Sequence, residues 1–350
     1  MTEAAIPRLA KGLGPLLPGI ALSTVVAIVS VLAEPVLKQM AGGRIGVPAV
    51  VIALLIGMSL HLVANNQRFV PGMTFCVKKL LRWAIALLGL RIALGDIVAL
   101  GLGTAVLVVV SMAATIVSGF VLARLLGRET GMGALGGVAT AVCGASAALA
   151  TATVVPDYRN KAADIAFTVI AMNALSTVAM LAYPLICVWL GLSEQQTGVM
   201  LGSTIHDVAQ VVGAGQSVSD EAANAAVIVK LFRVFMLLPA VLIVGWWLTR
   251  HGGEHGEAKV PVPVFAIVFL LLCLVNSILA TQPAFAGVYS PIRDVLLEAS
   301  RWGLLIAIAA LGLGTSIAAM ARLGWRHIAL VTGTSLVILL VATSGLILMG

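Results

Sequence analysis

Charged side chains are scarce in this sequence: Asp, Glu, Lys and Arg make up 10% of the 350 residues, and 61% are hydrophobic. A soluble domain has about 25% charged and about 45–50% apolar residues, so a soluble globular fold is excluded. Apolar runs recur along nearly the whole chain, and many reach the roughly 20 residues that cross a bilayer. The composition therefore predicts an all-α, polytopic membrane protein in which residues 1–350 form a single transmembrane domain in the lipid bilayer.

Cysteine is rare as well. The four cysteines have neither C-x-x-C spacing nor neighbouring histidines, so we expect no disulfide framework, no metal and no cofactor; they are Cys76, Cys143, Cys187 and Cys273. The phosphate-binding pattern G-x-x-x-x-G-K-[ST] is missing too. Any energy for transport must then come from gradients or from a partner chain.

The net charge of +7 does not indicate nucleic-acid binding, because the Lys and Arg residues lie in short loops between apolar runs. Such loop cations mark the cytoplasmic side of a membrane. They are more frequent in the alternate loops that contain Arg8, Lys78 and Arg128 than in those that contain Arg159 and Lys161. This bias predicts a multi-pass protein with a cytoplasmic N-terminus and an external C-terminus.

We count eleven hydrophobic segments, which predicts about 10–11 transmembrane helices. The segments are Leu16–Ala33, Val47–Val63, Leu80–Leu100, Leu102–Leu126, Gly133–Val155, Ile165–Leu190, Thr197–Gly215, Ala222–Leu248, Pro263–Ala280, Trp302–Met320 and His327–Met349. The polar stretch Thr249–Pro263, with His251 and His255, is best interpreted as a solvated loop.

An internal repeat accompanies these segments. Leu88–Gly101 aligns without gaps with Leu311–Gly324; both begin Leu-Gly-Leu, end Leu-Gly and follow an Arg-Trp pair. The copies lie in the third and tenth segments, within the regions 80–126 and 302–349, and would cross the membrane in opposite senses. Inverted repeats of this kind are typical of secondary transporters, although similarity among Leu, Gly and Ala also arises by chance.

Two regions, 133–155 and 197–248, contain the candidate substrate site. The first, rich in Gly, Ala, Ser and Thr, predicts a helix broken near Gly144, with Cys143 and Ser146 beside the break. The amides at the start of a half-helix would bind negative charge. A closely packed, unbroken Ala/Ser helix is the alternative.

The second region contains His206, Asp207 and Gln210 in an otherwise apolar segment. An Asp at the centre of a span costs about 2.5–3.5 kcal/mol, so this group needs partners or a wet cavity. On a helix, His206 and Gln210 would share a face. Lys230 and Arg233 would share a face of the next segment, either paired with Asp207 as a structural brace or available to a translocated anion. His206 or Asp207 could couple a proton.

Further polar residues could line the same path: Asn173, Ser176 and Asn276 in other segments, and the hydroxyls of Ser203 and Thr204. Singly, such residues more often form hydrogen bonds between helices. An intramembrane enzyme is not expected, since Ser146 lacks the G-x-S-x-G pattern. A passive anion channel and a structural or regulatory protein without a substrate stay open as alternatives.

These motifs resemble the YeiH-type family of proposed sulfate exporters. The resemblance covers residues 17 to 340 and rests on "GSTIHDVAQVVGAG", "VKLFRVFMLLP", "CGASAALA" and the repeated "LGL" spans; Val208 replaces a family threonine. It implies an inverted-repeat carrier of the sodium/proton-antiporter or bile-acid-symporter kind, with broken helices crossing near the midplane. The implied site residues are Cys143, Gly144, Ser146, His206, Asp207, Gln210, Lys230 and Arg233.

The sequence as a whole predicts a secondary transporter of a small anion, which could be proton-coupled. The resemblance implies an exporter or exchanger in the bacterial inner membrane, with sulfate or a sulfonate as the favoured substrate. The predicted substrate-binding residues are Cys143, Gly144, Ser146, Asn173, Ser203, Thr204, Gln210, Lys230, Arg233 and Asn276. A homodimer is compatible with the sequence.

Overall fold

The computed structural model describes residues 14–40, 48–64, 66–250, 264–280, 282–315 and 325–349, and these are helical almost throughout. The predicted loop histidines His251 and His255 lie outside this part of the chain. The contacts divide the chain into two units: Met1–Gly95 with Val264–Ile317, and Asp96–Pro263 with Ala318–Gly350. We call them unit 1 and unit 2.

Unit 1 is built on the long helix α17, which packs against α2, α3 and α6. Its elements are α2 (Leu17–Met40), α3 (Ala49–Ser59), α4 (His61–Ala64), α5 (Val70–Phe75), the π-helix η1 (Cys76–Leu80), α6 (Leu81–Leu87), the 3₁₀ turn η2 (Leu88–Leu90), α16 (Val264–Leu279) and α17 (Pro283–Gly314). Glycine permits close approach of α17 to α3: a Cβ on Gly312 would lie 2.5 Å from the Leu54 carbonyl oxygen. Small residues allow such backbone contact in a membrane, where no hydrophobic effect drives helices together.

Two predicted segment boundaries in unit 1 are wrong. The third segment begins at Val70, because α5, η1 and α6 follow one another directly, and Lys78 and Lys79 lie exposed on a helix rather than in a loop. The tenth begins at Pro283, because α17 continues through a charged stretch in which Arg293 pairs with Asp294. The first repeat copy forms η2, a turn and the short α7 (Leu94–Ala99); much of the second lies outside the described residues, so the repeat stays a prediction.

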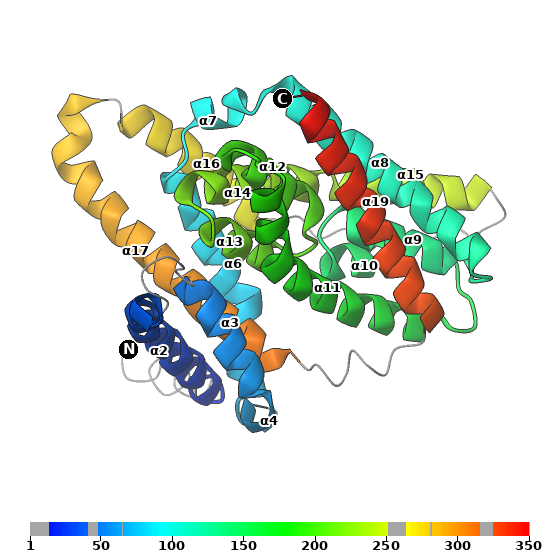
Figure 1. Cartoon of the computed structure of the whole chain (residues 1–350), viewed down its shortest axis with the longest axis horizontal. Coiled ribbons are helices and arrows are strands. Elements are labelled where there is room, and N and C mark those ends of the chain that lie inside the picture. Colours follow the sequence, from blue (N-terminus) through cyan, green and yellow to red (C-terminus); the bar gives the residue numbers. More distant parts are fainter. Residues whose placement is uncertain are drawn as a thin grey trace, which may run out of the picture. The chain divides into compact units, whose positions relative to one another are not determined.

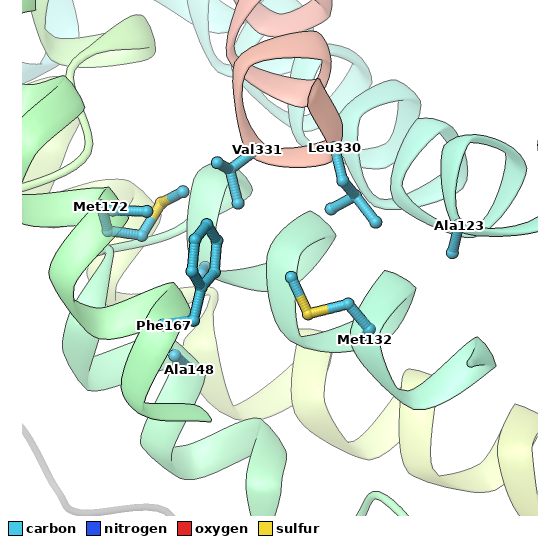
Figure 2. Packing of buried hydrophobic residues seen from close by; sticks show 9 residues of the cluster. Ala123, Met132, Ala148, Phe167, Met172, Leu330 and Val331 are labelled. Atoms are coloured by element: carbon cyan, nitrogen blue, oxygen red, sulfur yellow. The ribbon is translucent and has the colours of Figure 1, made fainter. Parts of the chain in front are cut away.

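Unit 2 contains the candidate site (Figure 1). Its helices are α8 (Gly101–Leu125), α9 (Thr130–Ala141), α10 (Ala145–Ala152), α11 (Lys161–Trp189), α12 (Glu194–Thr204), α13 (Val208–Gln216), α14 (Asp220–Phe235), α15 (Leu237–Arg250) and α19 (Trp325–Met349). Helix α8 packs against α9 and α19, and α12 packs against α14. Figure 2 shows the apolar cluster in which Met132 of α9, Phe167 of α11 and Leu330 of α19 meet.

Helices α9 and α10 form a re-entrant hairpin, which we call the first hairpin. Gly131 at the start of α9 lies against Val155 and Tyr158, which follow the end of α10; a Cβ on Gly131 would be 2.5 Å from Tyr158 Cε1. The two helices also pack against each other. The chain therefore leaves the first hairpin at the end of unit 2 where it entered.

Helices α12 and α13 form the second hairpin. Gly198 and Gly202 of α12 lie against Ala222 and Ala226 of α14, so these helices run parallel, and Gly215 near the end of α13 lies against Ala223. The Ser219 hydroxyl before α14 donates to the Glu194 carboxylate at the start of α12 (2.6 Å). The second hairpin also returns to the end where it entered. The two hairpins enter unit 2 from opposite ends, because the long helix α11 connects the end of the first hairpin to the start of the second.

This arrangement corrects the expectation that residues 133–155 and 197–215 each span the membrane. The four half-helices have 12, 8, 11 and 9 residues. At about 1.5 Å per residue they are about 12–18 Å long, which reaches only part of the way through a hydrocarbon core of about 30 Å. Two of the eleven predicted spans, 133–155 and 197–215, are therefore hairpins. Six helices are long and apolar enough to cross a membrane in the described part of the chain.

The hairpins also correct the predicted sides of two loop cations. Arg159 and Lys161 were expected opposite Arg128, but the first hairpin returns the chain to the end that contains Arg128. We call this the basic end of unit 2; its cations are Arg124, Arg128, Arg159, Lys161, Arg250 and Arg326. At the other end, where α12 begins and α13 gives way to α14, lie Glu194, Asp220 and Glu221, and residues 190–222 contain neither Lys nor Arg. We call that the acidic end.

Candidate substrate site

The tips of the two hairpins form the candidate site. At the first tip, α9 ends at Ala141 and α10 begins at Ala145, and Gly144 between them has a φ of +65°. A side chain is strained in this left-handed conformation, whereas glycine adopts it freely. The predicted break at Gly144 is thus confirmed.

The break in the second hairpin was not predicted. Ile205, His206 and Asp207 separate α12 from α13, with extended backbone at Ile205 and Asp207. His206 therefore lies in the tip and does not share a helix face with Gln210. The Asp207 side chain accepts a hydrogen bond from the Ala209 amide (3.2 Å) and so caps α13. An Asp that can cap a helix was the sequence signal for this break.

Lys230 of α14 joins the two tips. Its ammonium donates to the carbonyl oxygens of Val142 (2.6 Å), Ile205 (3.0 Å) and His206 (2.6 Å), and the side chain is fully buried. An ammonium has three N–H donors, so all of them are matched by backbone oxygens from the two breaks.

Arg233, one turn further along α14, binds the same two helix ends. Its guanidinium donates to the carbonyls of Thr140 (2.8 Å) and Ala141 (2.9 Å) in α9, and of Gly202 (2.8 Å) and Ile205 (3.0 Å) in and after α12. The last carbonyls of a helix have no partner within it and bear partial negative charge. Lys230 and Arg233 share a helix face as predicted, and their hydrogen bonds neutralise the C-terminal ends of α9 and α12.

The N-terminal ends of α10 and α13 face the same interior region from opposite ends of unit 2. Ser146 in the first turn of α10 is exposed, Asp207 is partly exposed, and Cys143 is buried. On α11, Ser176 accepts a hydrogen bond from the Asp207 amide (3.1 Å), and Asn173, one turn earlier, is exposed. Polar groups from both hairpins and from α11 thus lie around two electropositive helix starts.

His206 is enclosed. Its Nε2 lies 2.9 Å from the Ser335 hydroxyl of α19, and that hydroxyl donates its one hydrogen to the Val331 carbonyl (2.7 Å). The histidine is therefore the donor, with its proton on Nε2. Ser335 was missed in the sequence, since a serine within an apolar span carries no signal of its partner.

The remaining predicted site residues differ from one another in their surroundings. Thr204 donates to the Met200 carbonyl within α12 (2.7 Å), whereas Ser203 Oγ and both amide atoms of Gln210 are buried and have no hydrogen-bond partner among the described residues. Asn276 belongs to unit 1, where it accepts from the Tyr289 hydroxyl (2.9 Å) and donates to the Ile92 carbonyl (3.4 Å).

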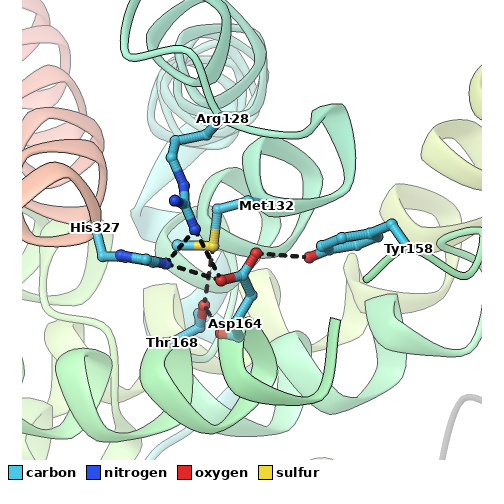
Figure 3. Close-up of polar contacts among 6 residues, drawn as sticks. All are labelled: Arg128, Met132, Tyr158, Asp164, Thr168 and His327. Carbon is cyan, nitrogen blue, oxygen red and sulfur yellow. Dashed lines mark hydrogen bonds and ion pairs between the residues drawn. The ribbon is translucent and has the colours of Figure 1, made fainter. Parts of the chain in front are cut away.

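A second polar cluster, which the sequence did not reveal, lies at the basic end (Figure 3). The buried Asp164 carboxylate of α11 accepts hydrogen bonds from the Arg128 guanidinium (3.2 Å) and from the Tyr158 hydroxyl (3.0 Å). It also lies 2.8 Å from His327 Nε2. Burial and the neighbouring carboxylate raise the pKa of Tyr158 far above its usual value, so this tyrosine stays a donor. The cluster joins the α8–α9 loop, the segment after α10 and the start of α19 to α11.

The comparisons with known proteins identify the family. The model of the family described as "Conserved hypothetical protein 698" matches residues 18–331. The chain belongs to this family. UPF0324 membrane protein TauZ of Paracoccus pantotrophus is 40% identical over 337 residues, which are 95% of each chain. UPF0324 inner membrane protein YeiH of Salmonella typhi is 31% identical over 331 residues, 93% of this chain and 91% of that one.

The family match confirms the predicted resemblance to YeiH-type proteins. No solved structure shows significant similarity to the chain. Together with the six long apolar helices, the family establishes a polytopic membrane protein. Large apolar side chains such as Leu102, Val188 and Leu348 are exposed on these helices, which is compatible with a lipid environment.

Proposed function

We propose that this protein is a secondary transporter of a small anion in the bacterial inner membrane, with sulfate or a sulfonate as the substrate class. The observation that carries the proposal is the electrostatic asymmetry of the hairpin tips. Lys230 and Arg233 neutralise the carbonyl ends of α9 and α12, whereas the amide end of α10 carries the exposed Ser146 and the amide end of α13 is capped by the partly exposed Asp207. Helix N-termini are ready-made anion sites.

A tetrahedral oxyanion suits these groups because it offers several acceptor oxygens to amides and hydroxyls at once. In this proposal the Ser146 hydroxyl and the first amides of α10 contact the anion, with Asn173 beside them. Lys230 and Arg233 contribute by holding the tips and by cancelling nearby negative charge. The resemblance to the YeiH-type proteins supports sulfate or a sulfonate within the wider class of small anions.

Proton coupling fits Asp207 better than His206. Asp207 is partly exposed at the start of α13, where its negative charge would oppose an incoming anion, whereas His206 is enclosed and bonded to Ser335. A proton on Asp207 removes that repulsion, so anion and proton would bind together.

Uptake of labelled sulfate, or of a labelled sulfonate without an amine, by liposomes that contain the purified protein tests the proposal. Ser146→Ala removes one hydrogen bond to a charged ligand, worth about 1.5–3 kcal/mol; we therefore expect the apparent KM to rise about tenfold or more. Ser118→Ala is the matched control, because Ser118 donates within α8 to the Thr115 carbonyl.

A transporter also exchanges its substrate, so unlabelled anion inside the liposomes should accelerate uptake of the labelled anion. Steady, non-saturating flux would instead indicate a channel. If none of a panel of small anions is transported by the folded wild-type protein, the proposed function is wrong.

A further inference from the structure

Lys230 is held in an unusual way for a buried cation. Its ammonium donates three hydrogen bonds to backbone carbonyls, and its side chain has no exposed surface. Buried charges are costly unless they are paired or hydrogen-bonded. Here the compensation comes from three carbonyl oxygens and from the negative ends of two helices.

Carbonyl oxygens in this arrangement are also the ligands that proteins use for free monovalent cations, because they replace the ion's hydration shell. Val142 belongs to the first tip, and Ile205 and His206 belong to the second. A cation at the position of Lys230 Nζ therefore connects two separate hairpins. A divalent ion would call for carboxylate ligands, which these three positions do not supply.

Arg233 is not equivalent. Its donors are spread over four carbonyls by a planar guanidinium, with contacts of 2.8–3.0 Å. A spherical ion cannot reproduce that fork, whereas the ammonium of lysine is a compact point charge. Of these two residues, only Lys230 places a point charge where carbonyl oxygens from both tips converge.

We infer that the carbonyls of Val142, Ile205 and His206 form a monovalent-cation site whose occupant in this protein is the tethered ammonium of Lys230. The hairpin tips are then held together without a free Na⁺ or K⁺. A chain that lacks the ammonium should take up a free cation at the same place. The further consequence, that anion transport needs no Na⁺ or K⁺ at this site, rests on the proposed function.

Thermal unfolding of the purified full-length protein tests the site directly. Wild type and Lys230→Ala are compared in choline, Na⁺, K⁺, ammonium and methylammonium chlorides at one ionic strength. We expect the wild-type midpoint to be the same in all five salts. The alanine variant should be least stable in choline and should recover by several degrees, saturably, in at least one of the small cations.

Two controls locate the effect. Lys161→Ala removes a partly exposed lysine that donates to the Val155 carbonyl and to Asp157, and it should show no dependence on the cation. Lys230→Met fills the space of the lysine side chain with an uncharged group and leaves no room for an ion. This variant should therefore be destabilised equally in all salts. A response of Lys230→Met like that of the alanine variant would place the cation elsewhere and overturn the inference.

The inference is also overturned if the stability of folded Lys230→Ala does not depend on the cation. It is overturned as well if this variant fails to fold in every salt, since a bound cation should restore the missing charge. Uptake of labelled sulfate by wild type in choline and in Na⁺ is measured separately. Cation rescue of stability without transport of any anion would reject the proposed function and leave the cation site standing.

Discussion

Asp207 has a structural role in the second tip, and the proposed transport function would give it a second role. Its side chain caps α13 through the Ala209 amide, and its own amide bonds to Ser176, so the residue fixes the second tip. Its partial exposure places a carboxylate at the start of a helix that would otherwise attract an anion. The protonation of this group would then control whether the anion binds.

Asp207→Asn should separate the two roles, because Asn caps helices as well as Asp does. In wild type, uptake of the labelled anion should rise as the pH falls, since protonation removes the opposing charge. The variant should take up the anion with little pH dependence. Initial rates over a pH series, with Asp157→Asn as the control at an exposed position, measure this. A wild-type pH profile in the Asp207 variant would contradict the role.

At the scale of elements, unit 2 depends on joints between hairpins and long helices. The second hairpin is joined to α14 by glycines and by two cations, and the first is joined to α11 and α19 by an apolar cluster and by Asp164. Asp164 is the common acceptor for Arg128, Tyr158 and His327, which come from three different segments.

Asp164→Ala should therefore destabilise unit 2 strongly. It leaves the largely buried Arg128 without its carboxylate, and breaking a buried ion pair costs about 3–5 kcal/mol; the 20% exposure of Arg128 favours the lower end of that range. Thermal unfolding in detergent measures the loss. Asp157→Ala, which removes a carboxylate that is 97% exposed, should leave the midpoint unchanged. Equal effects of the two variants would show that the cluster does not hold the elements together.

For the molecule as a whole, the decisive feature is the charge difference between the two ends of unit 2. The basic end contains Arg128, Arg159 and Arg326, and the acidic end contains Glu194 and Glu221. The positive-inside rule predicts that the basic end lies in the cytoplasm. The C-terminal helix α19 begins at Trp325 near the basic end, so the same rule predicts that its last residues lie on the external side.

Cysteine labelling in intact cells can test this orientation, because the four native cysteines are buried. Asp157→Cys marks the basic end and Glu221→Cys the acidic end, and both positions are exposed. A membrane-impermeant maleimide should label the Glu221 variant in intact cells and the Asp157 variant only after permeabilisation. The reverse pattern would show that unit 2 has the opposite orientation.

The break at Gly144 was predictable because weak helix formers surround it, and the shared face of Lys230 and Arg233 followed from helical spacing. The partners of these cations were not predictable, since backbone carbonyls at a helix end leave no trace in the residue types around them. The re-entrant path was missed because Gly133–Val155 has the length of one span, and length cannot distinguish a crossing from a return.

The sequence by itself determined that this is a helical membrane protein, that polar groups are concentrated in residues 133–155 and 197–233, and that it resembles its family. These follow from composition, periodicity and local motifs, which are properties of neighbouring residues. Only the tertiary structure decided that the two weakly apolar segments turn back and that Lys230 and Arg233 bind their carbonyl ends. The reason is physical: unpaired carbonyls in an apolar interior need a donor from elsewhere in the chain, and only the fold brings that donor within reach.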